Sequence, residues 1–166
     1  MGIPNGAVFI NVVTDLHPCG GSIFITKKHD YRFTIDKRSC HIKRRIAAPT
    51  RRRIEQAGPA EALHVCAISV WEATMLEAKG RLLFNDDCTA WVRRALAAPG
   101  LSLFALTPEI AIASTRLPGA LHGDPADRLI VATARCCSAT LITADSAILA
   151  YGKAGHVRTL SASSSA

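Results

Sequence analysis

The stretch LHGDPADRLIVATAR, residues 121–135, predicts a helix that carries two carboxylates at its start. Asp124 suits the N-cap position, because its side chain can accept hydrogen bonds from the unpaired N–H groups of the first turn. Pro125 suits the first helical position, and Asp127 follows three residues after the cap. Apolar residues at helical spacing, from 129 to 134, predict a buried face. Caps of this kind are common in helices, so the stretch alone predicts a structure and not a function.

A second carboxylate-bearing segment follows this helix. The β-branched and apolar run Ala139–Thr143 predicts a buried strand, and Asp145 comes two residues after it. In open parallel α/β sheets, ligands bind beyond the carboxyl ends of the strands. Asp127, at the start of the preceding helix, can reach the same edge. The two segments therefore predict that Asp127 and Asp145 lie at one edge of a sheet.

Four stretches of the chain resemble PIN-domain proteins, and most closely the branch of VapC-like toxin ribonucleases. These stretches are HGDPADRLIVATAR (122–135), TLITADSAIL (140–149), ISVWEATMLEAKGRL (68–82) and LTPEIAIASTRLPG (106–119). The resemblance extends from roughly Ala47 to Leu160. It implies a three-layer α/β/α domain with a mainly parallel central sheet. The alternation of strands and helices along the chain indicates the same α/β class.

The resemblance also implies a first acidic residue near the N-terminus. The run Ala7–Thr14 predicts a strand that leads directly into Asp15. PIN-like proteins begin with such a strand and place their first carboxylate at its end. Leu16 stands where the family has a small hydroxyl residue, which leaves in doubt a hydrogen bond that would orient Asp15.

Glu72 admits two interpretations. The pattern Ser69-x-x-Glu72 fits a capping box, in which the glutamate side chain turns back to the N–H of the cap residue. The resemblance instead makes Glu72 the second acidic residue of the site, after the predicted strand Leu63–Ile68. Because two further acids are already predicted at the same edge, we favour the functional interpretation.

These residues together predict a metal-dependent ribonuclease. The predicted catalytic and metal-binding residues are Asp15, Glu72, Asp127 and Asp145. Carboxylate oxygens without cysteine or histidine suit a hard cation, Mg²⁺ or Mn²⁺. Arg128 follows Asp127 and is predicted to contact RNA, with an ion pair as an equally good interpretation. His122 is interpreted as a loop residue that forms hydrogen bonds, rather than as a metal ligand.

The resemblance implies partners that composition and spacing do not reveal. It implies an RNA substrate cut by hydrolysis, a homodimer, and a cognate antitoxin of a type II toxin–antitoxin system. The alternative function is a catalytically inactive PIN-fold binding or regulatory protein, in which the N-terminal part of the site is degraded. An intact antitoxin reading frame beside the gene would favour the active toxin.

Composition limits the class of protein. A chain of 166 residues that is 49% hydrophobic is long enough for one domain with a substantial core. No apolar run approaches the ~18 residues of a membrane span, and no secretory signal is visible, so we expect a cytoplasmic protein without a membrane partner. The six cysteines form no C-x-x-C pair, so we expect reduced thiols and no zinc site.

The positive charge is concentrated in one segment. Residues 27–53 hold eleven of the twenty Lys and Arg residues and two of the thirteen acids, while the net charge of the whole chain is +7. Residues 18–46 fit the family poorly. They are interpreted either as a basic insertion or disordered segment, or as a frameshifted stretch. Within them, residues 31–35 could form a strand. We expect one PIN-like domain over 1–160 and a tail over 161–166.

The remaining elements follow from periodicity and capping residues. Helices are expected at 48–57, from 69 to about 79, from 86 onward, at 108–116 and at 146–151, and strands at 63–68, 101–106 and 156–160.

Overall fold

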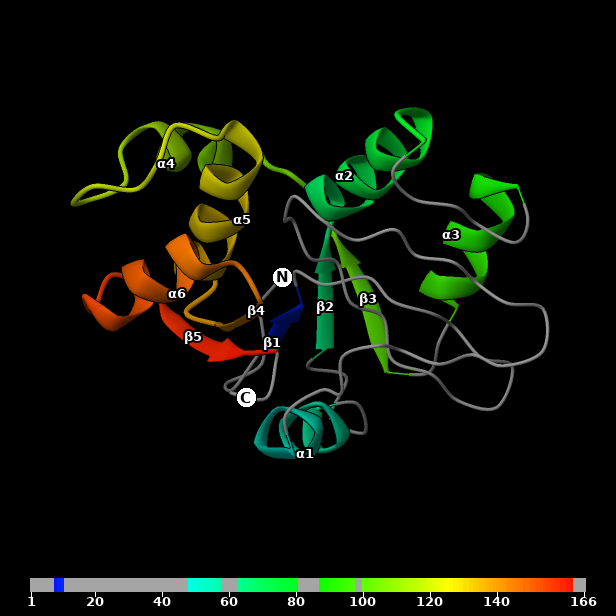
Figure 1. Cartoon of the computed structure of the whole chain (residues 1–166), viewed down its shortest axis with the longest axis horizontal. Coiled ribbons are helices and arrows are strands. Elements are labelled where there is room, and N and C mark those ends of the chain that lie inside the picture. Colours follow the sequence, from blue (N-terminus) through cyan, green and yellow to red (C-terminus); the bar gives the residue numbers. More distant parts are fainter. Residues whose placement is uncertain (1–7, 11–47, 58–62, 81–86, 98–99, 163–166) are drawn as a thin grey trace.

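The computed structural model describes residues 8–10, 48–57, 63–80, 87–97 and 100–162 (Figure 1). The strands are β1 (Val8–Ile10), β2 (Leu63–Cys66), β3 (Leu101–Phe104), β4 (Thr140–Thr143) and β5 (Arg158–Ser161). The helices are α1 (Ala48–Ala57), α2 (Ala67–Ala78), α3 (Cys88–Leu96), α4 (Pro108–Thr115), α5 (Pro125–Cys136) and α6 (Ser146–Lys153). Asp15, the segment 18–46 and the strand predicted at 31–35 lie outside the described residues.

The strands form one sheet in the order β3-β2-β1-β4-β5, and every pair of neighbours in it is parallel. The short strand β1 lies at the centre, where Phe9 is in register with both His64 of β2 and Leu141 of β4. All the carboxyl ends of these strands therefore lie at one edge, which we call the carboxyl edge. The predicted parallel sheet is confirmed.

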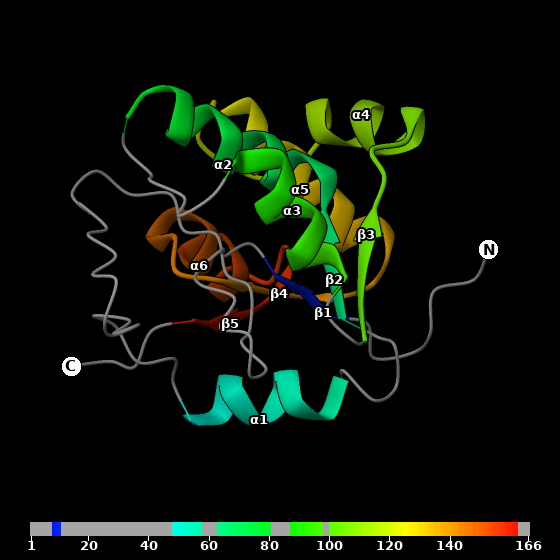
Figure 2. The ribbon, with the colours of Figure 1, turned by 90° about the vertical axis from the view of Figure 1, so that its right-hand side faces the viewer.

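Helices cover both faces of the sheet. Leu141 and Ile142 are adjacent in β4 and therefore point to opposite faces. Leu141 belongs to a core with residues of α5 and α6, whereas Ile142 packs with Ile54 of α1 and Leu63 of β2. Figure 2 shows α1 on one side of the sheet and the other helices on the opposite side. The structure thus confirms the predicted three-layer α/β/α architecture.

Helix α5 is the most deeply buried helix of the larger core. Ile130, Val131 and Ala134 on the predicted apolar face are at most 2% exposed, and they pack against Ile148 and Tyr151 of α6. Burial of this kind contributes roughly 0.8 kcal/mol for each CH₂ group. The helix is therefore held firmly along its length, and its first turn is rigidly placed at the carboxyl edge.

The helix start predicted at Ser69 is wrong. Strand β2 ends at Cys66, which is in register with Phe104, the last residue of β3. Helix α2 begins at Ala67 with Cys66 as its N-cap, and the Cys66 side chain makes no capping hydrogen bond. Ser69 therefore lies inside the first turn of the helix, and Glu72 lies in the second turn. The capping interpretation of Glu72 is removed.

The end predicted for the helix of residues 146–151 is also wrong. Helix α6 continues through Gly152 to Lys153, and the chain turns at Gly155, where φ is +84°. A Cβ atom on Gly152 would lie 2.2 Å from Oγ1 of Thr159 in β5. Gly152 is thus required for the close approach of α6 to β5, and Gly155 supplies the positive φ that ends the helix.

The described cysteines are free thiols that differ in exposure. Cys66 is buried, Cys88 and Cys137 are half-buried, and Cys136 is exposed. Burial raises the pKa of the Cys137 thiol to about 11 and raises that of Cys66 as well. These two thiols therefore stay protonated at neutral pH and pack as small apolar groups. Within the described part of the chain, no helix is both long and apolar enough to cross a membrane.

Candidate functional site

The first turn of α5 is built by Asp124, as predicted. Oδ1 of Asp124 accepts hydrogen bonds from the backbone N–H groups of Ala126, at 2.9 Å, and Asp127, at 3.4 Å. Pro125 occupies the first position of the helix, where no N–H donor is needed. Because Asp124 caps the helix, the Asp127 side chain is not required for that purpose.

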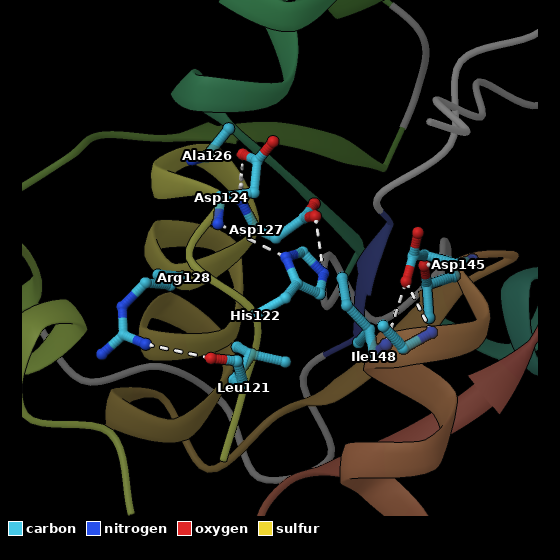
Figure 3. A network of polar contacts seen from close by, with 10 residues as sticks. Leu121, His122, Asp124, Ala126, Asp127, Arg128, Asp145 and Ile148 are labelled. Carbon is cyan, nitrogen blue, oxygen red and sulfur yellow. Dashed lines mark hydrogen bonds and ion pairs between the residues drawn. The ribbon is translucent and has the colours of Figure 1, made fainter. Parts of the chain in front are cut away.

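Asp127 is instead a buried carboxylate in contact with a histidine. Its side chain is 1% exposed, and its Oδ2 lies 3.2 Å from Nε2 of His122. Nδ1 of the same imidazole accepts a hydrogen bond of 3.3 Å from the backbone N–H of Asp124 (Figure 3). His122 thus forms hydrogen bonds in the loop, as predicted. Its contact with Asp127 was not predicted, because sequence spacing does not show how a loop folds back on a helix.

Glu72 reaches the same side of the sheet from α2. Its side chain is buried at 5% exposure, and α2 packs against α5. Sγ of Cys66, at the start of α2, lies 3.5 Å from Oγ1 of Thr133 in α5, which joins the two helices. Helix α2 begins at the carboxyl edge because it follows β2. Helix α5 also begins there, because it runs back across the sheet to the start of β4. The fold therefore places Glu72 and Asp127 on neighbouring helices at this edge.

Asp145 lies at the carboxyl edge, directly after β4, where the sequence predicted it. Its Oδ1 caps α6 by accepting hydrogen bonds from the backbone N–H groups of Ala147, at 2.8 Å, and Ile148, at 3.0 Å. The hydroxyl of Thr143 accepts a hydrogen bond from the Asp145 N–H at 3.1 Å. Asp145 therefore has a structural role in addition to the predicted role in the site.

Arg128 points away from Asp127 in Figure 3. Its Nε donates to the carbonyl oxygen of Ser114 at 2.9 Å, and Nη1 donates to that of Leu121 at 3.5 Å. These bonds tie the end of α4 and the loop before α5 to the side of α5. They account for the arginine as a structural residue, and its predicted contact with RNA stays a prediction.

Glu72 and Asp127, which are both buried on helices that pack together, have the donor chemistry of a site for a hard cation. Two carboxylates in a poorly solvated place are costly unless positive charge or hydrogen bonds compensate them. A divalent cation with oxygen ligands supplies such compensation. Within the ranges that the structure describes, no group of three or more His, Cys, Asp or Glu residues is arranged to hold a metal ion. Asp15, the remaining predicted ligand, lies outside those ranges.

A groove of about 790 Å³ lies at the opposite edge of the sheet. It is lined by residues from the ends of α5 and α6 and the starts of β4 and β5, among them Arg135, Lys153 and Arg158. Cations at the carboxyl end of a helix are favoured by the helix dipole, which explains Arg135 and Lys153. Of the predicted site residues that the structure describes, none lines this groove.

The fold agrees with what the chain is similar to. Over 86 residues it is 35% identical to Ribonuclease VapC22 of Mycobacterium tuberculosis, an alignment that covers 52% of this chain and only 65% of that protein. A crystal structure of DNA-bound VapBC from Salmonella typhimurium contains a chain with the same fold, at a TM-score of 0.51 and 14% identity, covering 69% of this chain and 85% of that one.

The profile of one protein family matches most of the sequence. The profile described as PIN domain matches residues 41–154, which include α1 to α6 and the candidate carboxylates Glu72, Asp127 and Asp145. This match spans well over half of the 166 residues. The chain belongs to the PIN domain family.

Proposed function

We propose that this protein is a metal-dependent endoribonuclease and the toxin of a type II toxin–antitoxin system. The observation that carries the proposal is the pair of buried carboxylates, Glu72 and Asp127, at the carboxyl edge of a PIN-family domain. Ligands of open parallel α/β sheets bind at this edge. The similarity to a protein named as a VapC ribonuclease supports the reaction class.

Mg²⁺ or Mn²⁺ is the proposed cofactor. Asp15, Glu72, Asp127 and Asp145 would hold it, directly or through water, since Mg²⁺ commonly takes only one or two carboxylates and keeps several waters. When bound, such an ion activates water and offsets charge on the phosphate during hydrolysis. The chain itself contributes the buried placement of Glu72 and Asp127, which excludes bulk water from these two carboxylates.

Asp145 is proposed to serve the site while it caps α6. Both capping bonds go to Oδ1, so one carboxylate oxygen carries the structural role. A carboxylate has about four lone-pair positions, which is enough for a cap and a further ligand. Arg128 is retained as a proposed RNA contact, although its bonds to backbone carbonyls support mainly a structural role.

The proposed partners are an RNA substrate, a cognate antitoxin and a second copy of the chain. The solved structure with the same fold comes from a VapBC complex bound to DNA, which supports an antitoxin partner. We further propose that residues 1–160 belong to one domain, because β1 near the N-terminus lies at the centre of the same sheet as β5. Strand β5 extends this domain to Ser161, one residue beyond the predicted boundary. Toxins that cut RNA act where RNA is present, so the proposed location is the cytoplasm.

A catalytically inactive PIN-fold binding protein is the second candidate. The observation that favours it is the capping role of Asp145, whose Oδ1 already accepts two hydrogen bonds from N–H groups of α6. In that case the fold would be stable, but the carboxyl edge would not bind a divalent cation.

The test compares metal binding with RNA cleavage. Purified full-length protein is titrated with Mn²⁺ by isothermal titration calorimetry, and cleavage of a labelled RNA library is followed with and without EDTA. We expect one or two bound Mn²⁺ ions and cleavage that stops with EDTA. A folded wild-type protein that neither binds Mn²⁺ nor cleaves RNA would overturn the nuclease and leave the inactive binding protein.

A further inference from the structure

The loop before α5 holds the imidazole of His122 at both of its nitrogens. The backbone N–H of Asp124 lies 3.3 Å from Nδ1, and Oδ2 of Asp127 lies 3.2 Å from Nε2. One histidine thus connects the residue that caps α5 with the carboxylate buried one turn later. The buried side of this contact is Asp127, at 1% exposure, and the solvent side is His122, at 37%.

These two contacts determine which ring nitrogen carries the proton. A backbone N–H can only donate, so the Nδ1 atom that accepts from Asp124 carries no proton. The proton of the imidazole is therefore on Nε2, and Nε2–H donates to Oδ2 of Asp127. With Nδ1 engaged by a donor and Nε2 protonated, neither nitrogen offers a lone pair to a metal ion. His122 is consequently a donor to Asp127 and not a metal ligand.

The loop that carries His122 is itself fixed by the helix start. The Asp124 side chain caps α5 through the N–H groups of Ala126 and Asp127, and the Asp124 backbone N–H holds the imidazole. Arg128 adds a further tie, because its Nη1 donates to the carbonyl oxygen of Leu121, next to His122. The orientation of the imidazole is thus determined by the same turn that carries Asp127.

We propose that His122 is a positioning residue that fixes the orientation of the Asp127 carboxylate for the divalent cation of the site. This inference rests on the proposed function and adds a residue to it. A charge-assisted hydrogen bond to one oxygen restricts rotation of the carboxylate, which lowers the cost of ordering it when the cation binds. Loss of a hydrogen bond to a metal ligand typically lowers metal affinity or activity about 10–100-fold.

Two substitutions test the contacts of the two His122 nitrogens separately. His122→Gln places an amide N–H near the position of Nε2 and keeps a donor for Asp127. His122→Asn is shorter, so it keeps an acceptor for the Asp124 N–H but cannot reach Asp127. We expect His122→Asn to weaken Mn²⁺ binding about tenfold or more and His122→Gln to stay within about threefold of wild type. Equal affinities in wild type and His122→Asn, or equal losses in both variants, would overturn the proposal.

RNA cleavage gives a readout that a merely structural role would not change. The Mn²⁺ concentration for half-maximal cleavage should rise in His122→Asn, and saturating Mn²⁺ should restore most of the rate. Thermal unfolding of each variant shows whether the fold is kept. A cleavage rate that stays low at every Mn²⁺ concentration in a folded His122→Asn protein would also contradict a positioning role.

The proton on Nε2 can be tested without metal or RNA. Long-range ¹H–¹⁵N spectra of full-length protein labelled with ¹⁵N-histidine should show the His122 ring protonated on Nε2. The signals of this ring are identified among those of the six histidines because they disappear in His122→Asn. The loss of the same ring in His122→Gln provides a second assignment. A ring protonated on Nδ1 at this position would overturn the inference. If wild-type His122 is protonated on Nε2 but the protein binds no Mn²⁺, the proposed function and the role of His122 in cation binding are both overturned. The hydrogen bond from His122 to Asp127 would still stand.

Discussion

Helices α4 and α5 pack against each other and begin with nearly the same pattern of residues. Thr107 caps α4 and is followed by Pro108 and Glu109, just as Asp124 caps α5 and is followed by Pro125 and, two residues later, Asp127. Yet the two acids end in opposite environments. Glu109 is exposed, and a hydrogen bond with Thr107 lowers the pKa of its carboxyl. Asp127 is 1% exposed and contacts His122.

The difference shows that the surroundings of a first-turn acid, and not its position in the helix, determine its role. Glu109 stays in solvent, where an acid near a helix N-terminus interacts favourably with the helix dipole and is screened by water and salt. Asp127 is covered by the His122 loop, and burial of a carboxylate opposes folding unless a compensating partner is present. Burial therefore distinguishes Asp127, the proposed site residue, from Glu109.

The strongest test of this contrast is to neutralise each acid separately. Asp127→Asn should lower Mn²⁺ affinity and RNA cleavage by more than about 100-fold, because a proposed ligand is lost. Glu109→Gln removes the same charge from a neighbouring helix and should stay within about twofold. Calorimetric titration and a cleavage assay measure both effects.

Thermal unfolding provides the control for this pair of variants. Asp127→Asn keeps the size of the side chain and an amide oxygen that can accept from His122, so the variant should stay folded in the absence of Mn²⁺. Equal metal affinity in the two variants would remove the distinction between α4 and α5.

The next test concerns Asp145, where cap and predicted ligand are the same residue. Asp145→Ala should destabilise the protein by about 0.5–2 kcal/mol, because two N–H groups of α6 lose their acceptor. Asp145→Asn keeps a good cap and should unfold within a few tenths of a kcal/mol of wild type, while Mn²⁺ affinity falls about tenfold. Chemical denaturation and metal titration separate the two properties. Unchanged metal affinity in Asp145→Asn would leave Asp145 as a cap alone.

The elements that could be predicted are those with strong local signals. The starts of α4 and α5 were predicted correctly, because a capping side chain followed by proline satisfies the helix start within four residues. The start of α2 was not, since Cys66 makes no side-chain cap and Ser69-x-x-Glu72 imitates one. Strand β2 ends where its partner β3 ends, at Phe104, and this is a property of the sheet that the local sequence does not contain.

The candidate site was predictable only in part, for a similar reason. Asp145 and Asp127 could be placed at the carboxyl edge from the order of strand and helix along the chain. The capping bonds of Asp145 are local, since it stands directly before the predicted helix, but only a role in the site was predicted for it. The His122–Asp127 contact depends on how a loop returns to a helix, and residue spacing does not encode that. Asp15 lies outside the described residues, so its place in the site stays a prediction.

A smaller effect is expected when the caps of the two helices are removed. Thr107→Ala and Asp124→Ala should each destabilise the protein by about 1 kcal/mol, the latter more, because Asp124 accepts two hydrogen bonds and Thr107 accepts one. Only Asp124→Ala should also weaken Mn²⁺ binding, because it loosens the turn that holds His122. Denaturation and calorimetry on the same samples test this, and a loss of metal affinity in Thr107→Ala would contradict it.

The smallest effect concerns the pH dependence of Glu109. A hydrogen bond with Thr107, followed by one with the backbone N–H of Glu109, lowers the pKa of this carboxyl below its ordinary value of 4.5. Folding therefore favours the ionised form. This contribution stabilises the protein above pH 4.5, and it is lost as the pH falls through the lowered pKa of the folded state.

Glu109→Gln should lower the free energy of unfolding slightly at pH 7, and its stability should converge with that of wild type in acid. Denaturation curves from pH 7 down to about pH 3 measure this difference. If the difference in unfolding free energy between the two proteins stays unchanged at low pH, packing and not charge causes it. Glu109 would then no longer be an example of an exposed first-turn acid with a purely electrostatic role.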